Sequence, residues 1–576
     1  FDCAYEKINF KRMGRSPLKK SLIIFFLFLP IVLYSQAEFV PVGHPVYSFL
    51  ERMDALQFIK EYDSFQKPKT RKAIAGYLKQ VEKNKIELNT IDRNIQLDLR
   101  SEFSLEMFET TYGYQSLIAG EKYDPFTEKE KYFYFNSGKK GNLFINLTVD
   151  ADYIYHSQYY YINNDAKLVN AGGIIRGTLM NTFGFYIQGS NGFSSGSKEA
   201  ALQKKELQYN YKFNEKYEET FFDDNEGHLS LDFDWFNLKL GRDRLMLGYG
   251  ANKAILSDNS PKFDYLQLQF NYGIFSFFSF HGKLLGENTL ISDSVSGGVN
   301  FVKEKYMAYH RLGFNIADNF TLGAGEIVIY GDRPMEFSYL NPFNFYKSVE
   351  HNNRDRDNAM VFFDLENRSI KGLKLFAMVL LDDIHYGKLG TGWYGNQTLW
   401  NFGFSSYNLY SIIPIDFHFE YTRVEPYVFT HRLPNNNFTN FGYGLSSVIA
   451  PNSELFFSKI NYRLSHRFEA SFSFSYTVHG ANYLDDQGNI IKNVGGDFAV
   501  GHRNGDADKV KFLDGVKQIY RKITIGFIYE LWNEIKLMMH TEFNSYSRQK
   551  NYFDFGEHIK FGDTNGTGIF SLQVRI

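Results

Sequence analysis

Apolar and polar side chains alternate along most of this chain. The stretch Phe468–Tyr476 reads Phe-Glu-Ala-Ser-Phe-Ser-Phe-Ser-Tyr, and residues 570–576 alternate in the same way. Because neighbouring side chains of a β-strand point to opposite faces, this period of two predicts strands with one apolar and one polar face. From about residue 132 onward, hairpins follow one another, joined alternately by tight turns and long polar stretches. This pattern is typical of an antiparallel transmembrane β-barrel.

The barrel should occupy residues 111–576. Allowing roughly 25 residues for each strand and its connection, we expect about 16 to 18 strands. The alternative is a soluble β-sandwich or propeller. That fold would leave the apolar carboxy-terminal strand and the abundance of aromatic residues unexplained.

Residues 38–110 carry a different period, in which apolar positions recur at helical spacing. They predict three helices: one following Pro45, one over Thr70–Lys83 and one over Thr90–Phe103, the last two capped by Thr70 and Thr90. So small a helical subdomain cannot bury a large core of its own. We expect it to pack on the barrel, either as an end-cap or as a plug.

Composition supports a barrel rather than a helical membrane protein. Aromatic residues make up 18% of the chain, as expected where they form girdles at two membrane interfaces. Mean hydropathy is −0.35, because a barrel exposes only every second strand residue to lipid. The net charge of −2 gives no electrostatic case for binding nucleic acid.

The amino terminus reads as an export signal. Basic residues precede the apolar run 22–33, and Ser35-Gln36-Ala37 supplies a small-x-small cleavage site, which predicts a signal peptide over residues 1–37 and a mature start at Glu38. Met13 is a plausible start codon, which would make residues 1–12 a spurious upstream extension. The apolar run is shorter than the roughly 20 residues of a spanning helix. We therefore expect export to the outer membrane, and the single cysteine, Cys3, would be removed with the signal.

One segment concentrates charge beside a predicted strand. Its candidate ligand-binding residues are Arg242, Arg244, Asp258 and Asp264. Alternation from Leu240 would direct both arginines toward lipid, which is costly in the middle of a bilayer. Either the arginines lie beyond the lipid, or a bulge at Gly241 or a loop folded into the barrel turns them inward, paired with an aspartate. A structural clamp is the alternative to ligand binding.

A second group of candidates lies in the long loops. Aromatic and amide side chains of the kind that bind sugars occur at Trp393, Tyr394, Asn396 and Trp400. The alternative is that these loops only pack inside the mouth of the barrel. Asp382-Asp383 reads as the solvated start of a loop, while Asp416 and Glu420 alternate with apolar residues and predict a wet interior.

The motifs of catalysis, metal binding and phosphate binding that we sought are missing from the sequence. Histidines have no metal-ligand spacing, and there is no Gly-x-Ser-x-Gly elbow or phosphate loop. We therefore expect no enzyme activity, no metal and no cofactor.

Several stretches carry a resemblance to a known family. They are the entry helices at 41–53 and 70–78, the segment 241–264 and Asn341-Pro-Phe343. Together they resemble the Wzi-type capsule assembly family, and the pattern is also similar to the RemB-type surface proteins of gliding motility. The resemblance implies an outer-membrane barrel with an amino-terminal helical bundle, acting as a non-enzymatic surface lectin that retains capsular or exopolysaccharide.

Three functions follow as hypotheses. The first is a protein that binds or organises surface polysaccharide, with that polysaccharide and outer-membrane lipid as partners. The second is a diffusion porin or solute channel. The third, a barrel enzyme, lacks a nucleophile–base pair in the sequence.

Overall fold

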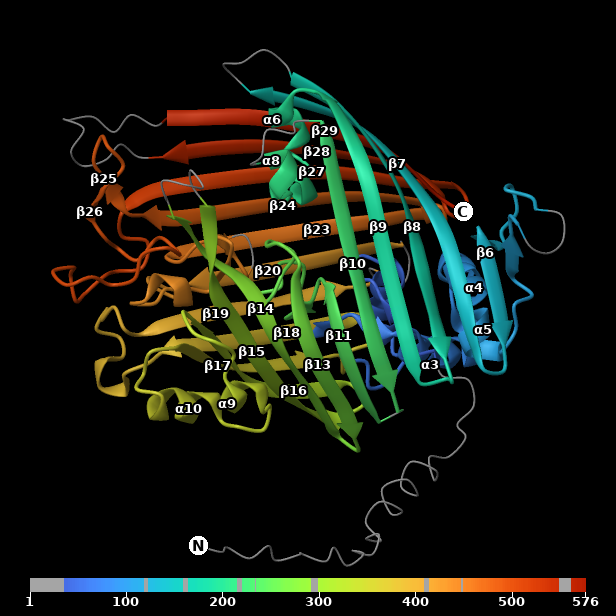
Figure 1. Ribbon diagram of the computed structural model, residues 1–576, viewed down its shortest axis with the longest axis horizontal. Coiled ribbons are helices and arrows are strands. Elements are labelled where there is room, and N and C mark those ends of the chain that lie inside the picture. Colours follow the sequence, from blue (N-terminus) through green and yellow to red (C-terminus); the bar gives the residue numbers. More distant parts are fainter. Residues whose placement is uncertain are drawn as a thin grey trace, which may run out of the picture.

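Eighteen strands of the described chain close into one antiparallel barrel in the computed structural model (Figure 1). The structure describes residues 36–118, 123–158, 164–214, 220–233, 235–291, 299–408, 414–446, 449–548 and 561–576, so all but the last two residues of the predicted signal peptide lie outside it. The barrel strands are β7 (Gly141–Gln158), β8 (Asn164–Leu179), β9 (Phe183–Gly196), β10 (Phe221–Asp232), β11 (Phe236–Asp243), β13 (Phe263–Tyr272), β14 (Phe275–Ile291), β15 (Val299–Ala317), β16 (Phe320–Gly331), β17 (Asn358–Asn367), β18 (Leu373–Asp383), β19 (Gln397–Ser406), β20 (Ile415–Val424), β23 (Ser453–Ser465), β24 (Phe468–Ala481), β27 (Val516–Trp532), β28 (Ile535–Arg548) and β29 (Phe561–Arg575). The predicted all-β barrel is confirmed, at the upper end of the expected strand count.

The last strand closes the barrel by pairing with the first. β29 pairs with β7 from Asn565↔Gln158 to Arg575↔Thr148, and β6 (Tyr134–Gly138) forms a hairpin on the first residues of β7. Short strand pairs lie outside this sheet: β1 (Phe39–Val40) with β3 (Lys69–Thr70), β2 (Gln66–Lys67) with β12 (Met246–Leu247), β4 (Tyr114–Ser116) with β5 (Glu130–Tyr132), β21 (Thr439–Asn440) with β22 (Tyr443–Gly444), and β25 (Tyr483–Leu484) with β26 (Ile490–Lys492).

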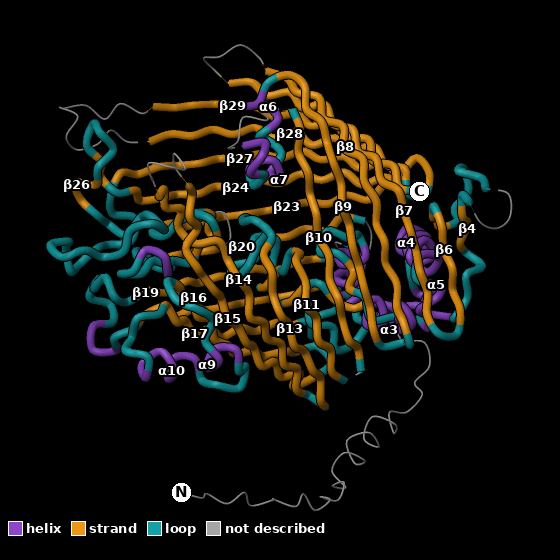
Figure 2. The backbone as a smooth tube through the Cα atoms, viewed as in Figure 1, coloured by secondary structure: helices purple, strands orange, loops and turns teal. Residues whose placement is uncertain are grey.

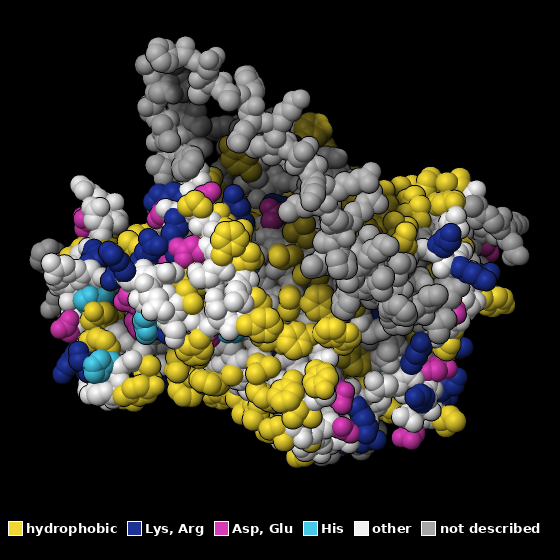
Figure 3. Space-filling model, turned by 60° about the horizontal axis from the view of Figure 1, so that its bottom comes forward, with side chains coloured by type: hydrophobic (Ala, Val, Ile, Leu, Met, Phe, Trp, Pro, Cys, Tyr) yellow, Lys and Arg dark blue, Asp and Glu magenta, His cyan; other side chains and the backbone are white. Residues whose placement is uncertain are grey.

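The outer surface of the barrel is apolar around its middle. Figure 3 shows hydrophobic side chains gathered over the middle of one face, with charged side chains toward both ends. Exposed apolar residues of the strands include Leu240, Leu266, Phe363, Leu375, Phe402, Phe456, Phe472, Leu537, Phe570 and Leu572. Such a band fits contact with lipid. Among the described helices, none has both the length and the apolar character needed to cross a membrane.

The amino-terminal helices are α2 (Val46–Ala55), α3 (Arg71–Lys83), α4 (Thr90–Glu102) and α5 (Ser104–Phe108). Thr70 caps α3, since its Oγ1 accepts a hydrogen bond from the Ala73 amide at 3.2 Å. The cap predicted at Thr90 is displaced by one residue, because Asn89 accepts from the Asp92 amide at 2.8 Å instead.

These helices lie at the end of the barrel that carries the short turns (Figure 1). The Gly372 amide in the turn between β17 and β18 donates to the Ala55 carbonyl at 2.7 Å, and Arg52 pairs with Asp416 at the start of β20. The longer loops and the short helices α9 (Phe337–Leu340) and α10 (Tyr346–Asn352) lie toward the opposite, outer end (Figure 2). Near β8 and β10 lie α6 (Lys198–Ala201), α7 (Lys205–Gln208) and α8 (Tyr211–Asn214).

Inserted segments fill much of the lumen. Phe65, which precedes β2, stacks on Phe362 of β17 at 5.9 Å and meets Tyr249 edge-on at 5.0 Å between ring centroids. Residues of the loops 244–262 and 425–446 join the same core, each at most 1% exposed: Leu245, Leu247, Tyr249, Ala254, Ile255, Leu256, Val428, Phe429, Phe438 and Leu445. The amino-terminal segment and two outer loops therefore meet inside the barrel.

The prediction of a wet interior is wrong for β20. Asp416 and Glu420 face inward, but they are buried against Arg52 and against the Ala251 amide, which donates to Glu420 at 2.9 Å. Farther round the barrel, on β27 and β28, the inward side chains of Lys522 and His540 stay 44% and 45% exposed. Alternation shows which side chains point into the lumen. It does not show whether they meet water or an inserted protein segment, because polar inward residues occur in both cases.

Asp98 of α4 should make helix docking dependent on pH. It lines a cleft of about 240 Å³ between α4 and the barrel wall, where burial and then Glu530 raise its pKa from 3.8 to about 7. Between pH 3.8 and about 7, the folded protein therefore binds more protons than the unfolded chain. The free energy of unfolding consequently falls as the pH rises toward 7. We expect Asp98→Asn to raise the free energy of unfolding by about 1 kcal/mol at pH 8, discounted for partial exposure, and not at pH 4. Urea unfolding in detergent measures this, and an equal gain at both pH values would contradict it.

Candidate functional site

The loop between β11 and β13 folds back into the barrel, one of the arrangements that the sequence predicted. Its β12 segment pairs with β2, and the Tyr249 hydroxyl donates to Asp364 on β17 at 2.8 Å. Gly250 has φ +68°, and a Cβ there would lie 2.5 Å from Glu420 Oε2. Because this position combines a left-handed backbone with a close approach to a buried carboxylate, it requires glycine.

The four charged candidates of this segment do not form one site. The bulge predicted at Gly241 is wrong, because β11 and β13 pair without a shift through Arg242↔Asp264. Arg242 therefore points outward near the outer end of β11 and pairs with Asp264 at 3.2 Å, both side chains exposed. Arg244 lies inside, where its Nη1 donates to the Asp258 carbonyl at 3.0 Å and the Asp258 carboxylate pairs with Lys205 at 3.0 Å. These contacts hold the loop in place.

The loop aromatics also separate. Trp400 on β19 points outward and is 48% exposed. Asn396 holds its own loop, accepting from the His385 amide and donating to the Lys388 carbonyl, each at 2.8 Å. Trp393 lies under Lys388 Nζ at 4.1 Å from the ring centroid. Among these four candidates, Tyr394 alone lines the cavity described next.

A polar cavity of about 440 Å³ opens among the outer loops. Five segments form it: α10 with the turn and the start of β17 that follow it, the end of β18, the start of β19 with Tyr394, the loop after β20, and the loop before β27. The residues lining it are Lys347, Glu350, His351, Asp355, Asp357, Asn358, Ala359, Asp382, Asp383, Tyr394, Gln397, Thr430, His431, Arg432, Gly501 and His502. Tyr394 stacks on His502 with ring centroids 3.5 Å apart.

Carboxylates dominate the electrostatics of this outer cavity. Glu350 pairs with Lys347 at 2.8 Å, yet burial outweighs that lysine and raises the pKa of Glu350 to about 7. Asp357 Oδ2 accepts from Arg333 at 2.8 Å and from the Tyr339 hydroxyl at 2.7 Å. Burial lowers the pKa of His431 to about 4, so this imidazole is neutral at physiological pH. The cavity thus offers mainly hydrogen-bond acceptors and negative charge.

A family comparison decides where the chain belongs. The model of the family described as capsule assembly protein Wzi matches residues 166–513, which is more than half of the chain. The chain belongs to the Wzi family. A search of curated protein sequences found no match.

A solved structure supports the barrel fold of this Wzi-family chain. Wzi of Escherichia coli, described as an outer membrane protein involved in group 1 capsule assembly and a carbohydrate-binding β-barrel, is similar at a TM-score of 0.53 and 10% identity, covering 93% of this chain and 99% of that chain. OccAB2 of Acinetobacter baumannii has a TM-score of 0.42 at 10% identity, covering 74% and 97%. OprD of Pseudomonas aeruginosa has a TM-score of 0.39 at 10% identity, covering 75% and 95%.

Sequence reasoning missed most of the outer cavity of this Wzi-family barrel. Asp382-Asp383 was interpreted as a solvated loop start, but Asp382 is 7% exposed and both carboxylates line the cavity. The cause is a bulge: Leu381 pairs with Thr398 and Asp383 with Gln397, leaving Asp382 as an extra residue. Paired carboxylates at the end of a strand were the one local signal available. The remaining residues come from loops that no sequence period connects.

Proposed function

We propose that this protein is an outer-membrane barrel that binds surface polysaccharide in its outer cavity and holds it at the cell surface. The observation that carries the proposal is the position of this polar cavity, open among the outer loops of a barrel whose lumen is largely filled by its own segments. Membership of a capsule assembly family supports it, as does the carbohydrate binding ascribed to the structurally similar Escherichia coli barrel. Binding of this kind needs no catalytic group, cofactor or nucleic acid. A role in gliding motility stays a prediction.

A diffusion channel is the competing function. The exposed inward side chains of Lys522 and His540 favour it, because they place water along one wall of the lumen. The inserted loops that follow β11 and β20 oppose it. We favour binding, since a wide pore would not need three segments packed into its centre.

Deletion of the gene separates the two functions. If the protein holds polysaccharide, the deletion strain should release surface polysaccharide into the medium while small-solute uptake stays unchanged. Cell-bound and released polysaccharide are measured after gentle centrifugation, with the gene restored in trans as the control. Impaired uptake with normal polysaccharide retention would favour the channel.

A point substitution in the cavity should weaken binding without unfolding the barrel. Asp383 is exposed and lines the cavity, so Asp383→Asn removes one charged acceptor. We expect a loss of about 1.5 kcal/mol, roughly tenfold in Kd for the polysaccharide. Trp400→Ala serves as the control, because that indole points away from the cavity and its loss should leave Kd unchanged. Equal effects of the two substitutions would argue against binding in this cavity.

A further inference from the structure

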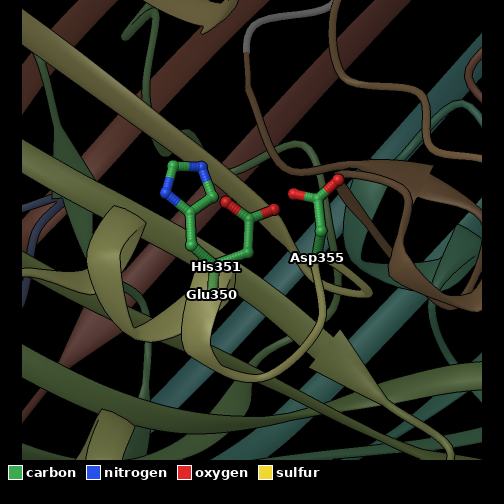
Figure 4. A group of neighbouring side chains, drawn as sticks. All are labelled: Glu350, His351 and Asp355. Atoms are coloured by element: carbon green, nitrogen blue, oxygen red, sulfur yellow. The ribbon is translucent and has the colours of Figure 1, made fainter.

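Three potential metal ligands meet in the wall of the outer cavity. Glu350 and His351 lie on α10 and Asp355 lies on the turn after it, and in Figure 4 the Glu350 carboxylate lies between the His351 ring and the Asp355 carboxylate. One ligand atom from each residue falls within 4.8 Å of the other two. Two carboxylates and an imidazole at this spacing can converge on one divalent cation.

The chain reverses direction to bring Asp355 back beside α10. Arg354 and Asp355 adopt φ +69° and +54°, in the left-handed region that non-glycine residues seldom occupy. The Asp355 amide then donates to the Glu350 carbonyl at 3.0 Å, and the Arg354 amide to the His351 carbonyl at 3.2 Å. The turn therefore fixes the Asp355 backbone next to Glu350.

Two buried carboxylates of this cavity have an oxygen with no partner. Glu350 is 3% exposed; its Oε2 lies 2.8 Å from Lys347 Nζ, and its Oε1 accepts no hydrogen bond from the described residues. Asp382, at 7% exposed, uses Oδ2 to accept from the Phe429 amide at 2.6 Å, and within the described chain its Oδ1 accepts nothing. Neither of these two unpaired oxygens is among the fully buried atoms, so both are accessible to accept from a ligand. Both residues line the cavity, so a ligand held there can satisfy them.

The charge balance of the lining indicates a positive ligand. Its carboxyl groups are Glu350, Asp355, Asp357, Asp382 and Asp383, and its permanent cations are Lys347 and Arg432. Burial raises the pKa of Glu350 to about 7 and raises that of Asp382, so these two carry only part of a negative charge at neutral pH. The other three carboxylates still outnumber the two cations, so negative charge exceeds positive charge within the lining. An anionic sugar could bind here directly only against this field, whereas a divalent cation would be attracted and could present positive charge to sugar oxygens.

We propose that Glu350, His351 and Asp355 hold a divalent cation that binds polysaccharide oxygens in the outer cavity. The cation site stands on its own geometry, while the contact with sugar rests on the proposed function. Ca²⁺ takes about six to eight ligands, so three side chains leave positions open for hydroxyl or carboxylate oxygens of a glycan. The cavity of about 440 Å³ provides the space for that sugar.

The cation site is tested with metal alone. Full-length protein in detergent is stripped with EDTA and titrated with CaCl₂ or MnCl₂ in a calorimeter. Wild type should bind one of them saturably, and Asp355→Asn and Glu350→Gln should each weaken binding by about tenfold or more. Asp486→Asn is the matched control, since it removes an exposed carboxylate from the turn between β25 and β26, outside the cavity lining. Asp355 is exposed, so its variant keeps the test valid if Glu350→Gln fails to fold.

Absence of saturable binding, or unchanged binding in Asp355→Asn, would overturn the cation site. Polysaccharide binding is then measured in Ca²⁺ or Mn²⁺ and in EDTA, and it should fall by about tenfold in EDTA for wild type and much less for Asp355→Asn. Equal polysaccharide binding in metal and in EDTA would overturn the bridging role. A positively charged amino-sugar oligomer is a second probe, because it could bind the carboxylates directly. If such an oligomer binds best in EDTA, the cavity takes a cationic sugar rather than a metal ion, which would also overturn the bridging role. If metal binds but polysaccharide binds under none of these conditions, the proposed function fails and the cation site stands.

Discussion

Arg311→Ala should lower the free energy of unfolding by about 3–5 kcal/mol. Arg311 on β15 is 2% exposed, and its Nε and Nη2 donate to Asp364 at 2.9 and 2.7 Å. Its Nη1 pairs with Asp63 at 3.2 Å, and its guanidinium lies 4.2 Å from the centroid of the Phe65 ring. Alanine would leave two carboxylates without their common partner, one on the barrel wall and one on the inserted amino-terminal segment.

Two measurements check this expectation. Urea unfolding in detergent gives the loss of stability, and limited proteolysis of residues 57–70 reports whether the inserted segment has left the lumen. Arg242→Ala is the control, because its exposed pair with Asp264 should contribute no more than about 1 kcal/mol. A loss at Arg311 as small as the loss at Arg242 would show that the ion pairs do not anchor this segment.

Replacing residues 246–256 with a short Gly-Ser linker should raise the ion conductance of the barrel severalfold. These residues include Leu247, Tyr249 and Ile255, each at most 1% exposed in the core that fills the lumen. Their removal would leave a water-accessible space between the wall of β17–β20 and the amino-terminal segment. It would also expose Glu420, which accepts hydrogen bonds from the Ala251 and Asn252 amides.

Single-channel recording in planar bilayers measures the change. Removing residues 485–489, in the turn between β25 and β26, is the control because that turn belongs to none of the buried cores among the described residues. Conductance in the control should match wild type. If the loop deletion conducts no better than the control, other inserted segments seal the lumen and our account of this loop is wrong.

The strands were predictable because strand periodicity is local. For example, the tight turn Gly273-Ile274 joins β13 and β14, and its Gly273 adopts φ +58°, which glycine does readily. The cap of α3 at Thr70 follows from residue type alone, and the outward direction of Arg242 follows from alternation along β11. Each of these features depends on neighbours within a few residues in the chain.

The outer cavity was not predictable in the same way. Tyr394 and His502 stack although more than a hundred residues separate them, and Asp382 faces the cavity because a bulge shifts the register of β18. Long loops have no period that would reveal which of them fold inward. Arg244 shows the limit: alternation from Leu240 placed it beside Arg242, but the strand ends at Asp243 and the loop turns it into the lumen.

The most direct test of the central claim is cosedimentation of proteoliposomes with polysaccharide isolated from the same cells. Our account predicts saturable binding by the wild-type protein, reduced about tenfold by Asp383→Asn and unaffected by Trp400→Ala. Polysaccharide pelleting with wild-type proteoliposomes no better than with protein-free liposomes would contradict it.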